Sequence, residues 1–396
     1  MADALPCAAC GGSDLAVFYN QSNIPMNSML LLDDARAARE FPRGALELAR
    51  CATCGFITNV AYDIGSSEYS QRYEASQAYS PVFNAFADGL AQRWVDTHNI
   101  HNKTVLEIGC DKGDFLALMC EKGNNRGIGI DPAADPQRQT GSSAHDRMTF
   151  IADFYSEKYA HLDADVVICR HTLEHIASVR EFMTTVRAAL GDRTDTLVLF
   201  ELPDVRRVLE DFAFWDLYYE HCSYFTLGSL ARLFRATGFE VVNLETDFGG
   251  QYLLVEARPA STTPASGAPL AVEDDLAAMT EIVTAFRDGI GGRLGGWRSE
   301  IGDLRAEGRR AVIWGGGSKG VAYLTSLGLQ DDIDYAVDIN PFKQGRFLAG
   351  CGQEVVAPEF LREYGPDVVI AMNPIYSEEI QTMLDGLGVH AELRAV

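Results

Sequence analysis

Two CxxC pairs near the start of the chain constrain its fold more than any other feature. "CAAC" places Cys7 and Cys10 on one tight turn, and "CATC" places Cys51 and Cys54 on another. Four thiolates presented by two such turns can form the tetrahedral shell of one zinc ion. A closed four-sulfur shell leaves no position for water or substrate, so we predict a structural zinc site in a small N-terminal domain. Free thiols or a redox CxxC pair are the alternative, although a redox site needs only one pair.

Hydrophobic content indicates the number of folded domains, and net charge excludes some classes of partner. The 396 residues are 47% hydrophobic, which is enough for two or three folded domains. A formal net charge of -23 argues against nucleic acid or an anionic membrane as partner, so an anionic ligand would need a local basic cluster. The sequence shows neither a signal-peptide pattern nor an apolar run of about 18 residues. We therefore expect a soluble, cytoplasmic protein, and the sequence leaves its oligomeric state open.

A strand, glycine turn and helix are predicted at 103–119, "KTVLEIGCDKGDFLALM". This unit brings backbone amides close to a cofactor at the end of a parallel strand. The loop departs from G-x-G-x-x-G, and a glutamate inside the strand favours a methyltransferase over a dehydrogenase. An aspartate after the next strand, "RGIGIDPA", can accept hydrogen bonds from both hydroxyls of an adenosine ribose. The predicted S-adenosylmethionine contacts are Glu107, Gly109, Cys110, Asp111, Gly113 and Asp131, with Asp153 near the adenine.

The order of the strands that follow indicates the fold class. Apolar strands are predicted at 148–154, 164–176, 196–203 and 238–245, and an antiparallel-looking strand, "QYLLVEA", comes last. This order is typical of the α/β, Rossmann-like core of class I S-adenosylmethionine methyltransferases. The alternative is an unrelated doubly wound domain that carries a glycine turn and a following acid by chance.

A change of composition separates a third domain. Residues 258–275 are rich in Pro, Ser, Thr and Ala, which predicts a linker or an exposed crossing. A second strand, glycine turn and helix follow at 309–324, so we predict a smaller Rossmann-like domain there. The predicted domains are a zinc-binding domain at 1–68, a methyltransferase domain at 69–258 and a C-terminal domain at 273–396.

The C-terminal domain carries the basic residues that an anionic ligand would need. Lys319 lies in its glycine loop, and Lys343 and Arg346 follow its second strand. A helix N-terminus combined with lysine suits phosphate, so we predict that these three residues bind the substrate. A solvated basic rim is the alternative.

Several motifs together resemble one family, the bacterial C-methyltransferases that act on nucleotide-linked deoxyketosugars. The resemblance covers almost the whole chain and depends on "IPMNSM" between the CxxC pairs, "EIGCDKG", "YYEHCSYF", "GGGSKG" and "VDINPFKQGRFLAG". It implies a zinc-binding N-terminal domain, a central S-adenosylmethionine domain and a C-terminal Rossmann-like domain, with a nucleotide sugar as substrate. The chain departs from the family at Tyr219, where histidine is frequent, and around Tyr73, where "SQRYEASQAYS" follows the family only loosely.

The chemistry of carbon methylation gives the "YYEHCSYF" motif a role. A carbon beside a ketone becomes nucleophilic when a base removes its proton and the enolate is stabilised, and histidine is the natural base near neutral pH. On a helix, Tyr218 and His221 would share one face. The resemblance implies that His221 is the base and that the enolate takes the methyl group by in-line displacement. It also implies supporting roles for Tyr218, Glu220, His175 and Tyr73.

The sequence leaves other interpretations of His175 and of the protein's function open. His175 can equally be a structural hydrogen-bond donor at the end of a strand. An O- or N-methyltransferase of another small molecule, or a noncatalytic assembly protein with vestigial sites, would carry many of the same motifs.

Overall fold

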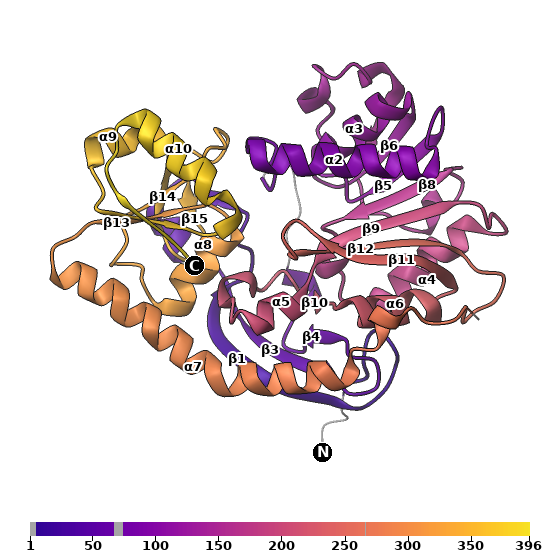
Figure 1. Ribbon diagram of the computed structural model, residues 1–396, viewed down its shortest axis with the longest axis horizontal. Coiled ribbons are helices and arrows are strands. Elements are labelled where there is room, and N and C mark those ends of the chain that lie inside the picture. The colour runs from indigo at the N-terminus through magenta and orange to yellow at the C-terminus, as the bar shows by residue number, and fades with distance from the viewer. Residues whose placement is uncertain (1–4, 67–73, 266) are drawn as a thin grey trace.

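The computed structural model describes residues 5–66, 74–265 and 267–396, and its strands form three sheets (Figure 1). Tyr73, which the family resemblance brought into the site, lies outside the described residues. Within those ranges, no helix combines the length and the apolar composition that crossing a bilayer requires.

The N-terminal region builds an antiparallel sheet around two long strands, β1 (Leu15–Pro25) and β3 (Arg43–Cys51). β4 (Ile57–Asn59) pairs with β3, and β10 (Ser223–Tyr224), from the middle of the chain, pairs with β4. Because Ser223 and Tyr224 of β10 belong to the "YYEHCSYF" motif, this sheet fixes the position of that motif.

The central region contains a seven-stranded sheet with the order β11-β12-β9-β8-β5-β6-β7. β12 runs antiparallel to both of its neighbours, and the pairs among the other strands are parallel. This topology confirms the predicted α/β class I methyltransferase core. Its strands are β5 (Thr104–Ile108), β6 (Arg126–Ile130), β7 (Met148–Ile151), β8 (Val166–Arg170), β9 (Leu197–Pro203), β11 (Phe239–Asp247) and β12 (Tyr252–Pro259).

Helix α2 (Pro81–His98) shows how local sequence sets the ends of the elements around this sheet. The Ser80 side chain accepts a hydrogen bond from the Phe83 backbone N–H, Pro81 occupies the first turn, and Asn99 ends the helix in a left-handed conformation. The other helices of the central region are α3 (Asp114–Gly123), α4 (Val179–Leu190), α5 (Val205–Glu210) and α6 (Leu227–Ala236).

The C-terminal region contains a second seven-stranded sheet with the order β18-β17-β13-β14-β16-β15-β2. β13, β14, β16, β17 and β18 pair in parallel, as expected for a Rossmann-like unit. The strands are β13 (Ala311–Trp314), β14 (Tyr335–Val337), β15 (Phe347–Leu348), β16 (Glu354–Val356), β17 (Val368–Ala371) and β18 (Glu392–Ala395). The helices are α8 (Ser318–Leu327), α9 (Leu361–Tyr364) and α10 (Ser377–Leu387).

The three regions share a sheet edge and a long helix, so they are joined more closely than domains that only flexible linkers connect. β2 (Leu31–Leu32), which precedes α1 (Ala35–Arg39), pairs with β15 at the edge of the C-terminal sheet. Helix α7 (Leu276–Ala306) passes along the N-terminal sheet on its way to the C-terminal region (Figure 1). The boundaries predicted at 68 and 273 stay a prediction, and β2 and β10 each join a sheet of another region.

Only part of the predicted linker at 258–275 is an exposed connecting segment. Its first residues complete β12, and its last residues pack on α6. Glu273 is 4% exposed and forms an ion pair of 2.7 Å with Arg235, while Asp275 pairs with Arg232 at 2.6 Å. These pairs explain the difference, because buried carboxylates with cationic partners hold a segment that its Pro and Ser content alone would leave free.

Candidate active site

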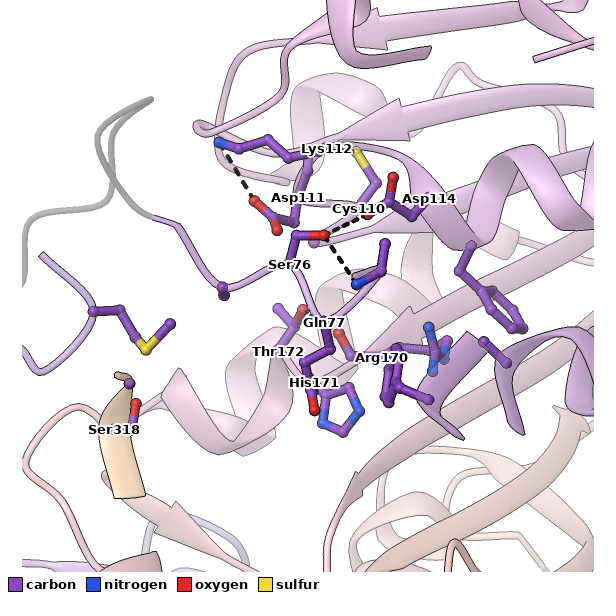
Figure 2. Close-up of a pocket in the computed structure, with 18 of the residues that line it drawn as sticks. Ser76, Gln77, Cys110, Asp111, Lys112, Asp114, Arg170, His171, Thr172 and Ser318 are labelled. Carbon is purple, nitrogen blue, oxygen red and sulfur yellow. Dashed lines mark hydrogen bonds and ion pairs between the residues drawn. The ribbon is translucent and has the colours of Figure 1, made fainter. Parts of the chain in front are cut away.

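A cavity of about 880 Å³ lies between the central and C-terminal regions. The carboxyl ends of β5, β6 and β8 line one side, the loops after β13 and β14 line the other, and Met29 reaches it from the N-terminal region. Figure 2 shows His171 and Thr172 below the loop from Cys110 to Asp114, with Ser318 of the C-terminal region across from them. Parallel α/β sheets bind ligands at this edge, so the cavity is the candidate active site.

The loop after β5 and the acid after β6 form one wall of this cavity. Asp131 accepts hydrogen bonds from the backbone N–H of Asp111 at 3.0 Å and of Ala133 at 2.6 Å. These bonds orient both carboxylate oxygens. Gly109 has a φ of +74°, and a Cβ on it would overlap the side chain of Thr172. Only glycine therefore fits here, which lets the backbone come close to a ligand.

The residues of this wall fit S-adenosylmethionine. Glu107 is 2% exposed, burial raises its pKa to about 8, and its Oε2 accepts no hydrogen bond from the described residues. Such an oxygen requires a donor, and a ligand carrying an amino group supplies one. Together with Glu107, the cavity lining includes Gly109, Cys110, Asp111, Asp131 and Asp153.

Two predicted cofactor residues have other local partners. Gly113 is the N-cap of α3 with a φ of +84°, and a Cβ there would overlap the ring of Phe150, so its role is in the turn. Asp153 lines the cavity and forms an ion pair with Lys158, which together with the Tyr159 hydroxyl at 2.5 Å lowers its pKa to about 2. Asp153 is therefore a fixed anion at the rim.

Tyr218, His175 and His221 lie together in the cavity wall. The rings of Tyr218 and His221 are 4.1 Å apart, and those of His175 and His221 are 4.7 Å apart. Burial, followed by the nearby His175, holds the pKa of His221 well below its usual value, so the ring is neutral at pH 7. A neutral imidazole beside a phenol can accept a proton from a substrate.

The helix on which Tyr218 and His221 would share one face does not form. Residues 217–222 form a turn, in which the His221 N–H donates to the Tyr218 carbonyl at 3.2 Å. The reason is that Tyr219 also has to be buried: its hydroxyl accepts a hydrogen bond from the Asp63 N–H at 2.9 Å, and its ring packs on Gly44. The turn still places Tyr218 and His221 side by side, as the helix would have done.

Glu220 belongs to the support of the site and is absent from the cavity lining. Its Oε1 accepts hydrogen bonds from the Ser28 N–H at 2.8 Å and from the Ser28 hydroxyl. Burial raises the pKa of Glu220 to about 7. The "IPMNSM" motif thus has a structural function, since it ties the N-terminal region to the turn that carries His221.

A network of charged side chains that was not predicted from the sequence lies next to the histidines. Arg170 donates two hydrogen bonds to Glu201, at 2.8 and 3.0 Å, and His171 lies 2.8 Å from the same carboxylate. Although burial disfavours a charged ring, Glu174 and Glu201 raise the pKa of His171 to about 9. The signal that could have revealed this network is the sheet order, because β8 and β9 are parallel neighbours with Arg170 opposite Glu201.

The C-terminal side of the cavity carries two of the three predicted basic residues. Lys319 and Lys343 line the cavity, where Lys319 forms an ion pair with Asp216, and Lys343 with Asp338 at 3.1 Å. Arg346 lies outside the lining and pairs with Asp33 of the N-terminal region. The lysines can therefore meet an anionic ligand, whereas Arg346 connects two regions.

Asp338 repeats the arrangement of Asp131 in the second Rossmann-like unit. It accepts hydrogen bonds from the backbone N–H of Gly316 at 3.0 Å and of Asn340 at 2.8 Å. Asp338 was not predicted as a site residue, although it follows β14 as Asp131 follows β6.

The four N-terminal cysteines meet as the spacing predicted. The Sγ atoms of Cys7 and Cys54 are 3.6 Å apart, those of Cys10 and Cys51 are 3.7 Å apart, and all four lie within 4.8 Å of one another. Four sulfurs bound to one zinc at about 2.3 Å would be about 3.8 Å apart. The geometry is therefore compatible with a zinc site at some distance from the cavity.

The fold and this site define an S-adenosylmethionine-dependent methyltransferase. Residues 80–244 match the family described as "Methyltransferase domain", and residues 251–388 match "C-methyltransferase C-terminal domain". C-methyltransferase NovU of Streptomyces niveus is 30% identical over 94% of this chain and 90% of its own length. The chain belongs to this family of C-methyltransferases.

Solved structures of methyltransferases also match this chain, at lower identity. The N,N-8-amino-8-demethyl-D-riboflavin dimethyltransferase RosA of Streptomyces davawensis is 18% identical, with a TM-score of 0.36, over 45% of this chain and 56% of that one. The 1,6-didemethyltoxoflavin-N1-methyltransferase of Burkholderia thailandensis is also 18% identical, with a TM-score of 0.35, over 55% of this chain and 96% of that one.

Asp131→Ala is expected to weaken S-adenosylmethionine binding at least about 10-fold. The loss of a charged acceptor costs about 1.5–3 kcal/mol per hydrogen bond. Titration calorimetry measures the change, and Asp146→Ala, at an exposed position outside the cavity lining, is the matched control. Equal affinities for the wild type and the Asp131 variant would show that the ribose binds elsewhere.

Proposed function

We propose that the enzyme methylates a carbon next to the keto group of a nucleotide-linked deoxysugar, with His221 as the base. The observation that carries this proposal is the position of Tyr218, His175 and His221 between two Rossmann-like sites that share one cavity. One site suits the cofactor and the other suits the nucleotide, so an acceptor sugar between them would meet the histidines.

The chemistry assigned to the chain's own residues is a proton transfer. His221 takes the proton from the carbon next to the ketone, and the electron pair of the broken C–H bond forms the enolate. Tyr218, with its ring against that of His221, is placed to hold the substrate edge where negative charge develops. S-adenosylmethionine, when bound, supplies the electrophilic methyl group. His221 then releases its proton to solvent, because its buried site disfavours the charged ring.

The C-terminal region is proposed to bind the nucleotide. The loop at the start of α8 offers backbone N–H groups, and Lys319 and Lys343 supply positive charge next to it. Both lysines are paired with carboxylates, so a diphosphate would have to compete with Asp216 and Asp338 for them. Asp338 is placed to accept hydrogen bonds from a ribose, by analogy with Asp131.

The four-cysteine cluster is proposed to hold a structural zinc ion. The sulfur separations of 3.6 and 3.7 Å match a tetrahedral four-sulfur shell, which leaves no open coordination position for a substrate. Cys7, Cys51 and Cys54 also belong to the same hydrophobic cluster as Phe225, at the end of the "YYEHCSYF" motif. The ion would therefore support the active site from a distance.

A labelling experiment tests the proposed substrate class. The enzyme is incubated with S-adenosylmethionine carrying a ¹³C-methyl group and with nucleotide-linked keto-deoxysugars, the same sugars without the nucleotide, and the corresponding alcohols. Carbon NMR is expected to place the label on the carbon next to the ketone, and only in the nucleotide-linked keto-sugars. Label on oxygen or nitrogen, or equal turnover of the free sugars, would contradict the proposal.

A further inference from the structure

Glu174, His175 and His221 form a second cluster with the chemistry of a metal site, separate from the four cysteines. Each residue offers one ligand atom, and the three atoms lie within 4.8 Å of one another. Glu174 and His175 come from the 3₁₀ turn Leu173–His175 after β8, and His221 comes from the turn before β10. Two segments that are distant in sequence thus present three donors to one point in the cavity wall.

One oxygen of Glu174 is buried without a hydrogen-bond partner among the described residues. The residue is 2% exposed, and its Oε2 accepts no hydrogen bond, while its Oε1 lies 3.6 Å from His171 Nδ1. A buried carboxylate oxygen without a donor is costly, so natural proteins rarely leave one unpaired. A bound cation would supply the missing partner.

His175 has a backbone hydrogen-bond partner of the kind that metal-binding histidines use. Its Nδ1 lies 3.0 Å from the Glu220 carbonyl oxygen, which can only accept, so Nδ1 carries the proton. The lone pair of a neutral ring is then on Nε2. A backbone carbonyl that fixes the tautomer in this way is a common second partner of histidine ligands.

We propose that Glu174, His175 and His221 bind a divalent transition-metal ion, with Zn²⁺ as the best chemical match. Two imidazoles and one carboxylate are a set that zinc accepts with an open fourth position, whereas Mg²⁺ and Ca²⁺ prefer oxygen ligands. At bond lengths of about 2.0–2.2 Å, tetrahedral donors are about 3.4 Å apart, so binding of an ion would draw together donors that now lie within 4.8 Å of one another.

This site has a consequence for catalysis that goes beyond the proposed function. The ion uses the same His221 ring that would accept the substrate proton, so a bound ion and a proton transfer exclude each other. Zinc in excess of the structural ion is therefore expected to inhibit the enzyme.

Metal counting tests the site without depending on turnover. Wild-type protein that retains its first zinc ion is titrated with Zn²⁺, and bound metal is measured after removal of free ions. A second equivalent is expected, and Glu174→Gln and His221→Asn should each weaken its binding at least about 10-fold while the first ion remains. His390→Gln, at an exposed position, is the control that should bind both ions.

Cobalt distinguishes the two sites, because thiolate ligands give strong sulfur-to-cobalt absorption and the proposed site would not. Circular dichroism and S-adenosylmethionine binding verify the fold of each variant, and His175→Asn replaces any variant that fails to fold. The proposal is overturned if the wild type binds only the cysteine-held ion, or if the variants bind the second ion as tightly as the wild type. A failure of the sugar-labelling experiment would leave the metal count unchanged, so the two results are distinguishable.

Discussion

His221→Asn is expected to lower turnover by about 10² to 10⁴, the usual effect of removing a positioned general base. Asparagine keeps a polar side chain of similar size but cannot take the proton at neutral pH. S-adenosylmethionine affinity should stay the same, because the cofactor wall around Asp131 is formed by other residues. Initial rates with a competent acceptor and titration calorimetry measure the two quantities on the same preparation.

The matched control for this variant is His161→Asn, at an exposed histidine outside the cavity lining, which should retain full turnover. Tyr218→Phe should retain more turnover than His221→Asn, because the phenol supports the substrate and does not take the proton. If His221→Asn keeps wild-type turnover, the base lies elsewhere, and His175 becomes the next candidate.

Removal of the proposed structural zinc ion is expected to lower the free energy of unfolding strongly. Zinc binding contributes about 10–16 kcal/mol to the folding of small zinc domains, and an ion held by all four sulfurs would join the two cysteine turns. Chelation of the wild type, or Cys51→Ser, should therefore lower the Tm strongly. Activity should fall with it, because β10, next to His221, pairs with β4 of the same sheet.

Cys351→Ala is the control for this experiment. Cys351 is buried in the C-terminal region, away from the cluster, so its loss removes a small apolar group and leaves the zinc content at the wild-type level. Calorimetry and metal analysis measure both effects. A zinc-free protein with an unchanged Tm would contradict a structural role for the ion.

The central fold could be predicted because its signals are local. The apolar runs that became β5 and β6, the glycine turn after β5 and Asp131 follow one another within a short segment, and parallel strands place them at one edge. The second unit at β13 and α8 was predicted in the same way. The spacing within each CxxC pair places two thiols on one turn, and the two pairs lie together as expected.

The turn at 217–222 could not be predicted, because its burial is set by distant partners. Tyr219 packs against Gly44, and Glu220 bonds to Ser28, both in the N-terminal region. When nearly every residue of a segment is buried, no amphipathic pattern distinguishes a helix from a turn. Tyr218 and His221 are in contact although the segment is not helical, because a tight turn also brings together residues that are three positions apart.

Ion pairs between segments that are distant in sequence could not be predicted either. Arg346 was expected to bind substrate because it follows a strand with Lys343, but its partner Asp33 lies in the N-terminal region. The pairing of Lys319 with Asp216 depends likewise on how the C-terminal region packs against the central one. Such pairs follow from the arrangement of the three regions, which local patterns do not contain.

Exchange of the acceptor's carbon-bound proton with solvent tests the role of His221 most directly. The acceptor is incubated in deuterated water with S-adenosylhomocysteine and either the wild type or His221→Asn, and proton NMR follows the signal of the carbon next to the ketone. The wild type is expected to exchange this proton while the variant does not, with the His161→Asn control behaving as the wild type. Equal exchange in both proteins would contradict a proton transfer to His221, whereas a wild type that methylates the acceptor without exchanging this proton would indicate that deprotonation is concerted with methyl transfer.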